Sequence, residues 1–84
     1  MQLKDDIRAS VLKAIRANDG EPMMDSALRE YIRRRFPSVA HTEADLTMHI
    51  RFCEEHGWIT GTSVELAGLV WTLSPKGTLK AAQL

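Results

Sequence analysis

The chain has 84 residues, of which 44% are hydrophobic and 26% charged, so we expect one small globular domain, residues 1–84, and exclude a disordered chain. Eleven basic and eleven acidic residues give a formal net charge of zero, which excludes a strong overall attraction to nucleic acid but leaves local charged patches open. The single cysteine, Cys53, excludes an internal disulfide, and no apolar run approaches the ~18 residues of a membrane span, so we expect a cytoplasmic protein that makes no membrane contact.

The first predicted helix covers about Leu3 to Asn18. Apolar residues recur along it at three- and four-residue spacing, and the Asn-Asp-Gly sequence that follows is typical of a helix end, because Gly20 readily adopts a positive φ. The next residues, "EPMM", are expected to form either a brief edge strand or simply extended chain, since proline cannot donate a hydrogen bond within a central strand.

The second predicted helix begins near Asp25 or Ser26, both good N-cap residues, and ends before Pro37. We expect Val39 to fill the core beneath the turn that follows. The expected buried side of this helix consists of Leu28, Tyr31, Ile32 and Phe36. Its arginines are Arg29, Arg33, Arg34 and Arg35. They can be interpreted as a phosphate clamp, or as cations that the macrodipole favours near a helix C-terminus.

The third predicted helix lies within "TEADLTMHIRFCEEHG", residues 42–57. Thr42 and Asp45 have the spacing of a capping box, and Gly57 is placed to end the helix in the left-handed conformation. At about 100° per residue, one side of this helix gathers Leu46, Ile50 and Cys53, which we therefore expect to face the core.

The spacing then changes to that of strands. The segments "WITGTSVEL" and "LVWTL", separated by Ala67-Gly68, predict an antiparallel hairpin. One face of its second strand is expected to carry Leu69, Trp71 and Leu73. A short closing helix should follow, with Ser74 as its cap, Pro75 at its first position, and Leu79 and Ala82 packed inward.

This order of elements predicts a small α+β domain and resembles the winged helix-turn-helix domain of bacterial and phage regulators. The segment "FCEEHGWI" is similar to the end of the third helix and the entry to the wing in that family, and "VWTLSPKGTLKAA" is similar to its last wing strand and terminal helix. The resemblance covers nearly the whole chain. It implies a three-helix core, a two-stranded antiparallel β-hairpin wing and a short C-terminal helix.

The resemblance also implies a function, which is binding duplex DNA as a small transcriptional regulator, in many members as a homodimer. It places Thr47, Met48 and Arg51 in the major groove. Contacts to phosphate are expected from Arg33, Arg34, Arg51 and Lys76. We therefore expect a protein that is not an enzyme and whose partner is duplex DNA.

The third helix and the wing also favour an alternative, a winged-helix protein–protein interaction module or accessory subunit. The outward side of the helix carries Ala44, Met48, Phe52 and Glu55 around Arg51, and the wing sequence "TGTSVELAG" contains no lysine or arginine. Such a surface suits a protein partner or a second copy of the chain. A further interpretation is that the wing or the terminal helix simply covers part of it.

Catalytic and metal chemistry receive little support from the sequence. His49, Cys53 and His56 share one flank of the third helix, but Cys53 also suits the core, and zinc would need a fourth ligand. There is no nucleophile motif and no glycine-rich phosphate loop. We therefore expect no catalytic residue, no metal and no cofactor.

Overall fold

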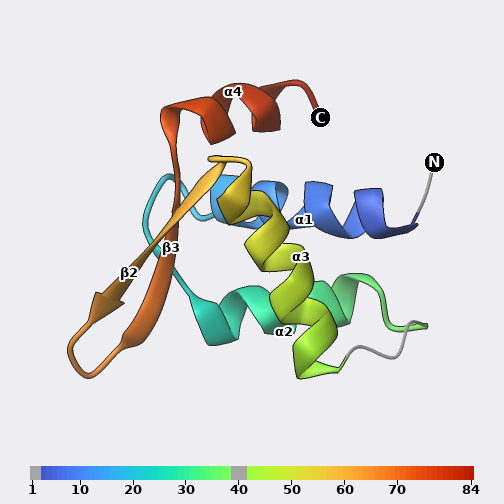
Figure 1. The fold of residues 1–84 in the computed structure, drawn as a ribbon, viewed down its shortest axis with the longest axis horizontal. Coiled ribbons are helices and arrows are strands. Elements are labelled where there is room, and N and C mark those ends of the chain that lie inside the picture. Colours follow the sequence, from blue (N-terminus) through green and yellow to red (C-terminus); the bar gives the residue numbers. More distant parts are fainter. Residues whose placement is uncertain (1–2, 39–41) are drawn as a thin grey trace.

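The computed structural model describes residues 3–38 and 42–84. The elements are α1 (Leu3–Ala17), β1 (Met23–Met24), α2 (Asp25–Arg35), α3 (Glu43–Glu55), β2 (Ile59–Val64), β3 (Gly68–Leu73) and α4 (Pro75–Ala82). The helices gather on one side and the tip of the β2–β3 hairpin projects away from them (Figure 1). The chain is therefore an α+β domain, as expected.

The sheet has three antiparallel strands in the order β1-β3-β2, so β3 is its central strand. Met23 and Met24 of β1 pair with Trp71 and Val70 of β3. The edge-strand interpretation of "EPMM" is therefore confirmed, and Pro22 lies just before the strand, where its missing amide hydrogen does no harm. On the other side of β3, Ile59 to Val64 pair with Leu73 to Gly68 as a hairpin.

The predicted capping residues of α3 and α4 are confirmed. The Thr42 hydroxyl accepts a hydrogen bond from the Asp45 amide at 3.1 Å, and the Asp45 carboxylate accepts one from the Thr42 amide at 3.2 Å, which completes the capping box. Gly57 ends α3 with φ +73°. The Ser74 hydroxyl accepts from the Gly77 amide at 2.9 Å, so Ser74 caps α4.

The start of α2 is a correction. The helix begins at Asp25, close to the predicted position, but neither Asp25 nor Ser26 is the N-cap. Met24 occupies that position and its side chain makes no capping hydrogen bond. The Asp25 carboxylate is instead engaged by Arg29 and Trp71, because these partners compete with the backbone amides for its oxygens.

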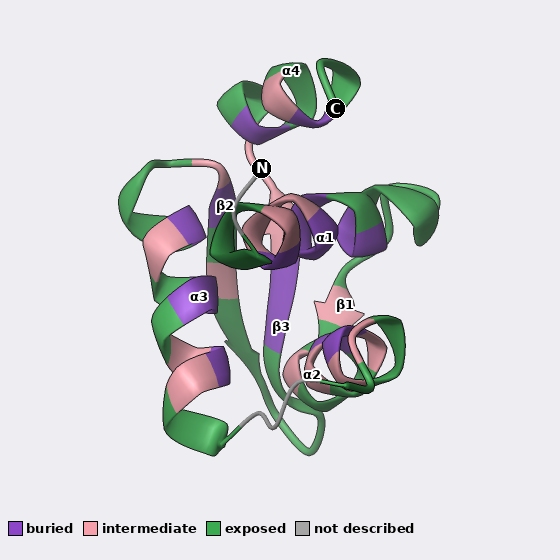
Figure 2. Cartoon of the chain, turned by 90° about the vertical axis from the view of Figure 1, so that its right-hand side faces the viewer, coloured by how far each residue is buried: buried purple, intermediate pink, exposed green. Residues whose placement is uncertain are grey.

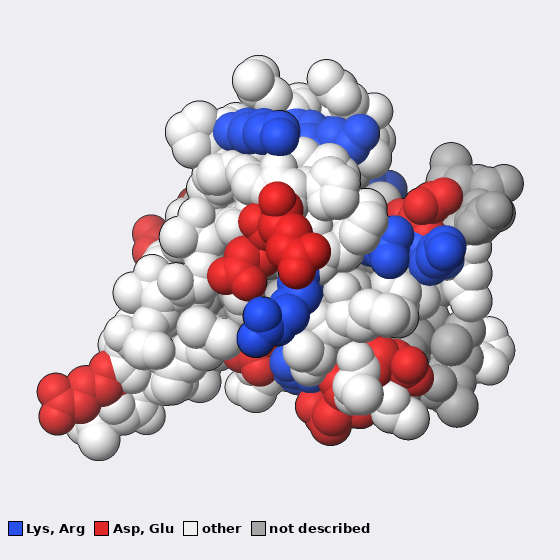
Figure 3. All heavy atoms as spheres, in the orientation of Figure 1, with Lys and Arg blue, Asp and Glu red and all other residues white. Residues whose placement is uncertain are grey.

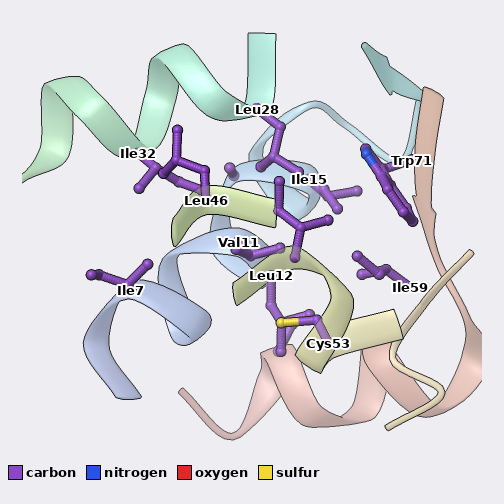
Figure 4. Packing of buried hydrophobic residues seen from close by; sticks show 13 residues of the cluster. Ile7, Val11, Leu12, Ile15, Leu28, Ile32, Leu46, Cys53, Ile59 and Trp71 are labelled. Atoms are coloured by element: carbon purple, nitrogen blue, oxygen red, sulfur yellow. The ribbon is translucent and has the colours of Figure 1, made fainter. Parts of the chain in front are cut away.

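The core lies around α1, against which the other three helices and β3 pack (Figure 4). The predicted buried side of α3 is confirmed, since Leu46, Ile50 and Cys53 are at most 1% exposed. His49 is buried beside them, and the outer side of α3 faces solvent (Figure 2). The buried cluster comprises Ile7, Val11, Leu12, Ala14, Ile15, Leu28, Ile32, Leu46, Ile50, Cys53, Ile59, Trp71 and Ala81.

Some expected core positions differ from the structure. Leu79 is 69% exposed and Ala82 is exposed, and the helix packs through Ala81 instead. Gly77 fixes this orientation of α4, because a Cβ at that position would lie 1.8 Å from the Trp58 carbonyl oxygen. On α2, Leu28 and Ile32 are fully buried, whereas Tyr31 and Phe36 are only half-buried and pack at the margin of the core. Val39 lies outside the described residues.

Candidate nucleic-acid interface

Arg29 of α2 lies where α2 meets the N-terminal end of α3. Its Nε donates to Asp25 Oδ2 at 2.8 Å, and its Nη1 donates to the carboxylate of Glu43 at 3.1 Å and to the Glu43 carbonyl at 3.2 Å. Its Nη2 donates to the Thr47 hydroxyl at 3.0 Å. The side chain is only 16% exposed, so these charge-assisted hydrogen bonds compensate the loss of water around the guanidinium.

Asp25 extends this network to the sheet. Its Oδ1 accepts a hydrogen bond at 2.9 Å from the indole Nε1 of Trp71, which is 5% exposed. The same carboxylate therefore satisfies a buried indole of β3 and orients Arg29 of α2. The four-residue spacing of Asp25 and Arg29 is visible in the sequence as a helical ion pair, but nothing in the sequence indicates the contact with Trp71.

Glu43, the first residue of α3, holds its carboxylate between two guanidinium groups. Arg29 contacts one carboxylate oxygen and Arg33 the other. The hydrogen bond from Arg33 is the largest cause that lowers the pKa of Glu43, and the positive charges of Arg33 and Arg29 add to it. The Glu43 side chain is 67% exposed. Two arginines of α2 thus form an anion site that the protein fills with its own carboxylate, and we call these three side chains the Glu43 clamp.

The remaining arginines of α2 lie beyond this clamp. Arg34 pairs with Glu30 at 2.8 Å, but the two side chains are 81% and 53% exposed, so this ion pair adds little to stability. Arg35 is also exposed, and its guanidinium lies 5.4 Å from the centre of the Phe36 ring. The C-terminal half of α2 therefore presents solvent-accessible positive charge next to the Glu43 clamp.

Residues predicted to contact DNA fall into two groups. Arg33 and Thr47 both join the Arg29 network, and Arg51 lies exposed one turn beyond Thr47. Lys76 is at the opposite end of α3, where its side chain passes near Gly57. The length of α3, roughly 20 Å for 13 residues, separates this lysine from the Glu43 clamp. Arg33 and Thr47 are therefore joined through the Arg29 network. Arg51 lies beside Thr47 along the side of α3 that faces the hairpin, and Lys76 lies apart from these residues.

A groove of about 250 Å³ runs between α3 and the β2–β3 hairpin. Arg51 and Glu54 both lie on its α3 side, so the two side chains offset each other in charge. On the opposite side, Leu69 and Trp71 supply an apolar wall. This groove lies between α3 and the hairpin, the two elements expected to touch DNA, and Arg29 of α2 adds a second positive charge to its lining.

The charge of α3 itself is acidic. It holds four carboxylates, those of Glu43, Asp45, Glu54 and Glu55, against the single guanidinium of Arg51. Figure 3 shows acidic atoms over the C-terminal part of α3, below a row of cations over α4, and further acidic atoms at the tip of the hairpin. The acidic C-terminal end of α3 repels phosphate, whereas cations lie over α4 above it (Figure 3) and on α2 beside the N-terminal end of α3.

The residues of the alternative protein interface are dispersed. Ala44 and Glu55 are exposed, and Met48 is 53% exposed. Phe52, however, is half-buried under the guanidinium of Arg8 at 3.6 Å and stacks on His56 at 4.0 Å between ring centres. The ring of Phe52 is therefore partly covered by Arg8 of α1 and by His56, and Trp58 meets its edge at 6.0 Å between ring centres.

The hairpin also exposes large apolar side chains, and their exposure is not predicted by the sequence. Val64 is 43% exposed, Leu69 38%, and Leu66 at the turn is fully exposed. Leu66 has φ +70°, a left-handed conformation that is costly for a leucine. An exposed leucine held in a strained backbone is an unusual feature for a turn with no evident packing role.

The histidine and cysteine side chains in and just after α3 are either buried in the core or close to the helix backbone. His49 and Cys53 are buried, and His56 is exposed with its Nδ1 2.8 Å from the Phe52 carbonyl. Burial raises the pKa of the Cys53 thiol to about 12, against a smaller opposing effect from Arg8. Among residues 3–38 and 42–84, no three His, Cys, Asp or Glu side chains are grouped so that they could hold a metal ion.

Comparison with protein-family models, curated protein sequences and solved structures gave no match for this chain. In the described part of the chain, every helix is too short or too polar to cross a membrane.

The Asp25 network generates a stability prediction. Asp25→Ala should lower the free energy of unfolding by about 2 kcal/mol, because it leaves the indole of Trp71 and the Nε of Arg29 without their acceptor. Glu30→Ala removes an exposed carboxylate from the same helix and should cost less than about 0.5 kcal/mol. Urea denaturation of both variants measures the difference. Equal losses would show that Asp25 does not connect α2 to the sheet.

Proposed function

We propose that the chain is a winged-helix domain that binds duplex DNA through phosphate contacts at the junction of α2 and α3. The observation that carries this proposal is the Glu43 clamp, in which Arg29 and Arg33 hold an anion at the surface. The order of the helices and the hairpin, together with the resemblance of "FCEEHGWI" and "VWTLSPKGTLKAA" to winged-helix regulators, supports the domain type.

A DNA phosphate can replace the carboxylate of Glu43. Carboxylate and phosphate oxygens both accept paired hydrogen bonds from guanidinium groups, and the exposed side chain of Glu43 can turn into solvent without disrupting the core. Arg34 and Arg35 lie exposed on the same end of α2 and would contact neighbouring phosphates. Phosphate contacts of this kind position a protein on the duplex.

Base contacts in this proposal come from the middle of α3. Thr47 and Arg51 follow the clamp along the helix, and arginine pairs well with the acceptor edge of guanine. Glu54 and Glu55 keep the C-terminal end of α3 away from the duplex because they repel phosphate. The proposed binding is therefore dominated by phosphate contacts, strongly dependent on salt and modest in sequence specificity.

The test exploits the competition between Glu43 and phosphate. Glu43→Gln should bind mixed-sequence duplex DNA several-fold more tightly than the wild type at low salt, as measured by fluorescence anisotropy. The salt dependence should also steepen by roughly one unit of slope for each additional phosphate that the variant neutralises. Glu54→Gln is the matched control, since it removes the same charge from an exposed position of the same helix.

Arg33→Gln in the Glu43→Gln background should abolish the tighter binding, because it removes one arm of the clamp. If Glu54→Gln tightened binding as much as Glu43→Gln, general charge would explain the effect and the clamp would not be a phosphate site. If none of these proteins bound duplex DNA at low salt, the DNA-binding proposal would be wrong.

A second candidate function, self-association through the hairpin, is favoured by one observation. The hairpin exposes Val64, Leu66 and Leu69, and its turn carries only Glu65 as a charged residue. Burying these side chains against a second copy of the chain would remove apolar surface from water and offset the backbone strain at Leu66. This candidate corresponds to the protein-interaction alternative, with the contact moved from Phe52 to the hairpin tip.

Sedimentation velocity at increasing concentration tests this candidate. The wild type should associate, and Leu66→Ser should shift it to monomer. Leu79→Ser is the control because Leu79 is an exposed leucine on α4, away from the hairpin. A wild-type protein that stays monomeric at all concentrations, or equal effects of the two variants, would rule the hairpin out as the contact.

A further inference from the structure

A cavity of about 350 Å³ opens between α1, the C-terminal end of α3 and α4. It is separate from the Glu43 clamp and shares no lining residue with it. Leu12, Phe52 and Trp58 give it apolar walls, and Arg8 and Lys80 add positive charge. Its volume falls at the lower end of the range for small-molecule sites, roughly 300 to 1,000 Å³.

Arg8 lies over one aromatic wall of this cavity. Its guanidinium carbon is 3.6 Å from the centre of the Phe52 ring. Its Nε is buried and has no hydrogen-bond partner in the described part of the chain. A buried donor without a partner is rare in folded proteins, because it has lost water and received nothing in exchange. The Nε of Arg8 therefore lacks an acceptor among the described residues, and the charge of the guanidinium is left for a ligand to neutralise at its terminal nitrogens.

Lys80 lies over the other aromatic wall, with its ammonium 5.4 Å from the centre of the Trp58 ring. Phe52 and Trp58 meet edge to face at 6.0 Å between ring centres. Within residues 3–38 and 42–84, neither Arg8 nor Lys80 takes part in an ion pair, and Asp5 is the one carboxylate of the lining. The cavity thus combines two cations that form no ion pair among the described residues, one carboxylate side chain and aromatic walls.

We propose that this cavity binds a small aromatic carboxylate. The carboxylate accepts hydrogen bonds from Arg8 and an ionic contact from Lys80, and the ring of the ligand packs against Phe52 and Trp58. A single negative charge suits a lining in which the cationic side chains of Arg8 and Lys80 outnumber the one carboxylate side chain, that of Asp5. Neutral and cationic aromatic molecules bring no negative charge to Arg8 and Lys80, so they bind more weakly.

This site does not depend on the proposed DNA or self-association function. A ligand here contacts α1, α4 and Phe52 of α3 at once, since all three contribute to the lining. Binding would therefore tighten the packing of the C-terminal end of α3 against the two helices beside it.

Titration with phenylacetate, followed by ¹H–¹⁵N NMR, tests the proposal. The indole N–H signal of Trp58 should shift and saturate in the millimolar range. The indole signal of Trp71 is an internal reference, because its N–H donates to Asp25 outside this cavity, and it should stay in place. Phenylacetamide has the same ring without the charge and should bind about tenfold more weakly, as should acetate, which lacks the ring.

Arg8→Gln should weaken phenylacetate binding about tenfold, because it removes the charged donor. Lys13→Gln is the control, being an exposed cation of the same helix that does not line the cavity. The spectrum itself reports whether each variant is folded. If the wild type gave no saturable shift at Trp58, or if phenylacetamide bound as well as phenylacetate, the proposal would be overturned. The comparison of phenylacetate with phenylacetamide on the wild-type protein tests the proposal even if Arg8→Gln does not fold.

Discussion

The junction of α2 and α3 depends on one guanidinium group, that of Arg29. Its donors reach Asp25 on its own helix and Glu43 and Thr47 on α3. A charge this deeply buried is tolerated only when its hydrogen bonds are satisfied, so the partners must hold their positions together. Because Asp25 also accepts from Trp71, the same charge indirectly ties both helices to the central strand.

The neutrality of the chain conceals how its charges are distributed. The arginines of α2 outnumber its acids by two, from Arg29, Arg33, Arg34 and Arg35 against Asp25 and Glu30. The acids of α3 outnumber its one arginine by three, from four carboxylates against Arg51. The Glu43 clamp lies where these two surfaces meet. A phosphate approaching this domain is attracted at the clamp and repelled further along α3, which sets both the site and the weakness of the proposed DNA contact.

The sequence predicted most of what local signals control. The capping box of α3, the positive φ of Gly57 and the start of α4 at Pro75 each depend on residues within a few positions. The hairpin and the buried side of α3 followed from periodicity. The prediction that Leu79 and Ala82 of α4 pack inward is wrong. Eight residues give only a weak periodic signal, and the rotation of α4 about its axis is fixed by the close approach of Gly77 to Trp58.

The candidate site was less accessible to sequence reasoning. Arg33, Thr47 and Arg51 are candidates from the sequence. Arg29, however, is only one of four arginines interpreted as a phosphate clamp or as cations at a helix end, and its contacts to Glu43 and Thr47 are not predicted. Its partners Glu43 and Thr47 lie 14 and 18 residues away, and Asp25 reaches Trp71 across 46 residues. Contacts at such separations depend on how the helices pack, so composition and spacing do not reveal them. The helical periodicity of α3 likewise predicts that Phe52 faces outward, but it does not reveal that Arg8 of α1 lies over its ring.

The central claim is that the carboxylate of Glu43 occupies a site formed by two arginines. The most direct test is a ¹³C NMR titration of the Glu43 carboxyl carbon in the wild type and in Arg33→Gln. The folded-state pKa is lowered, so the stabilising contribution of Glu43 is complete above its ordinary pKa of 4.5 and is lost as the pH falls through the lower folded value. We predict a wild-type midpoint below 4.5 that moves back toward 4.5 in Arg33→Gln. A wild-type midpoint at or above 4.5 would contradict the clamp.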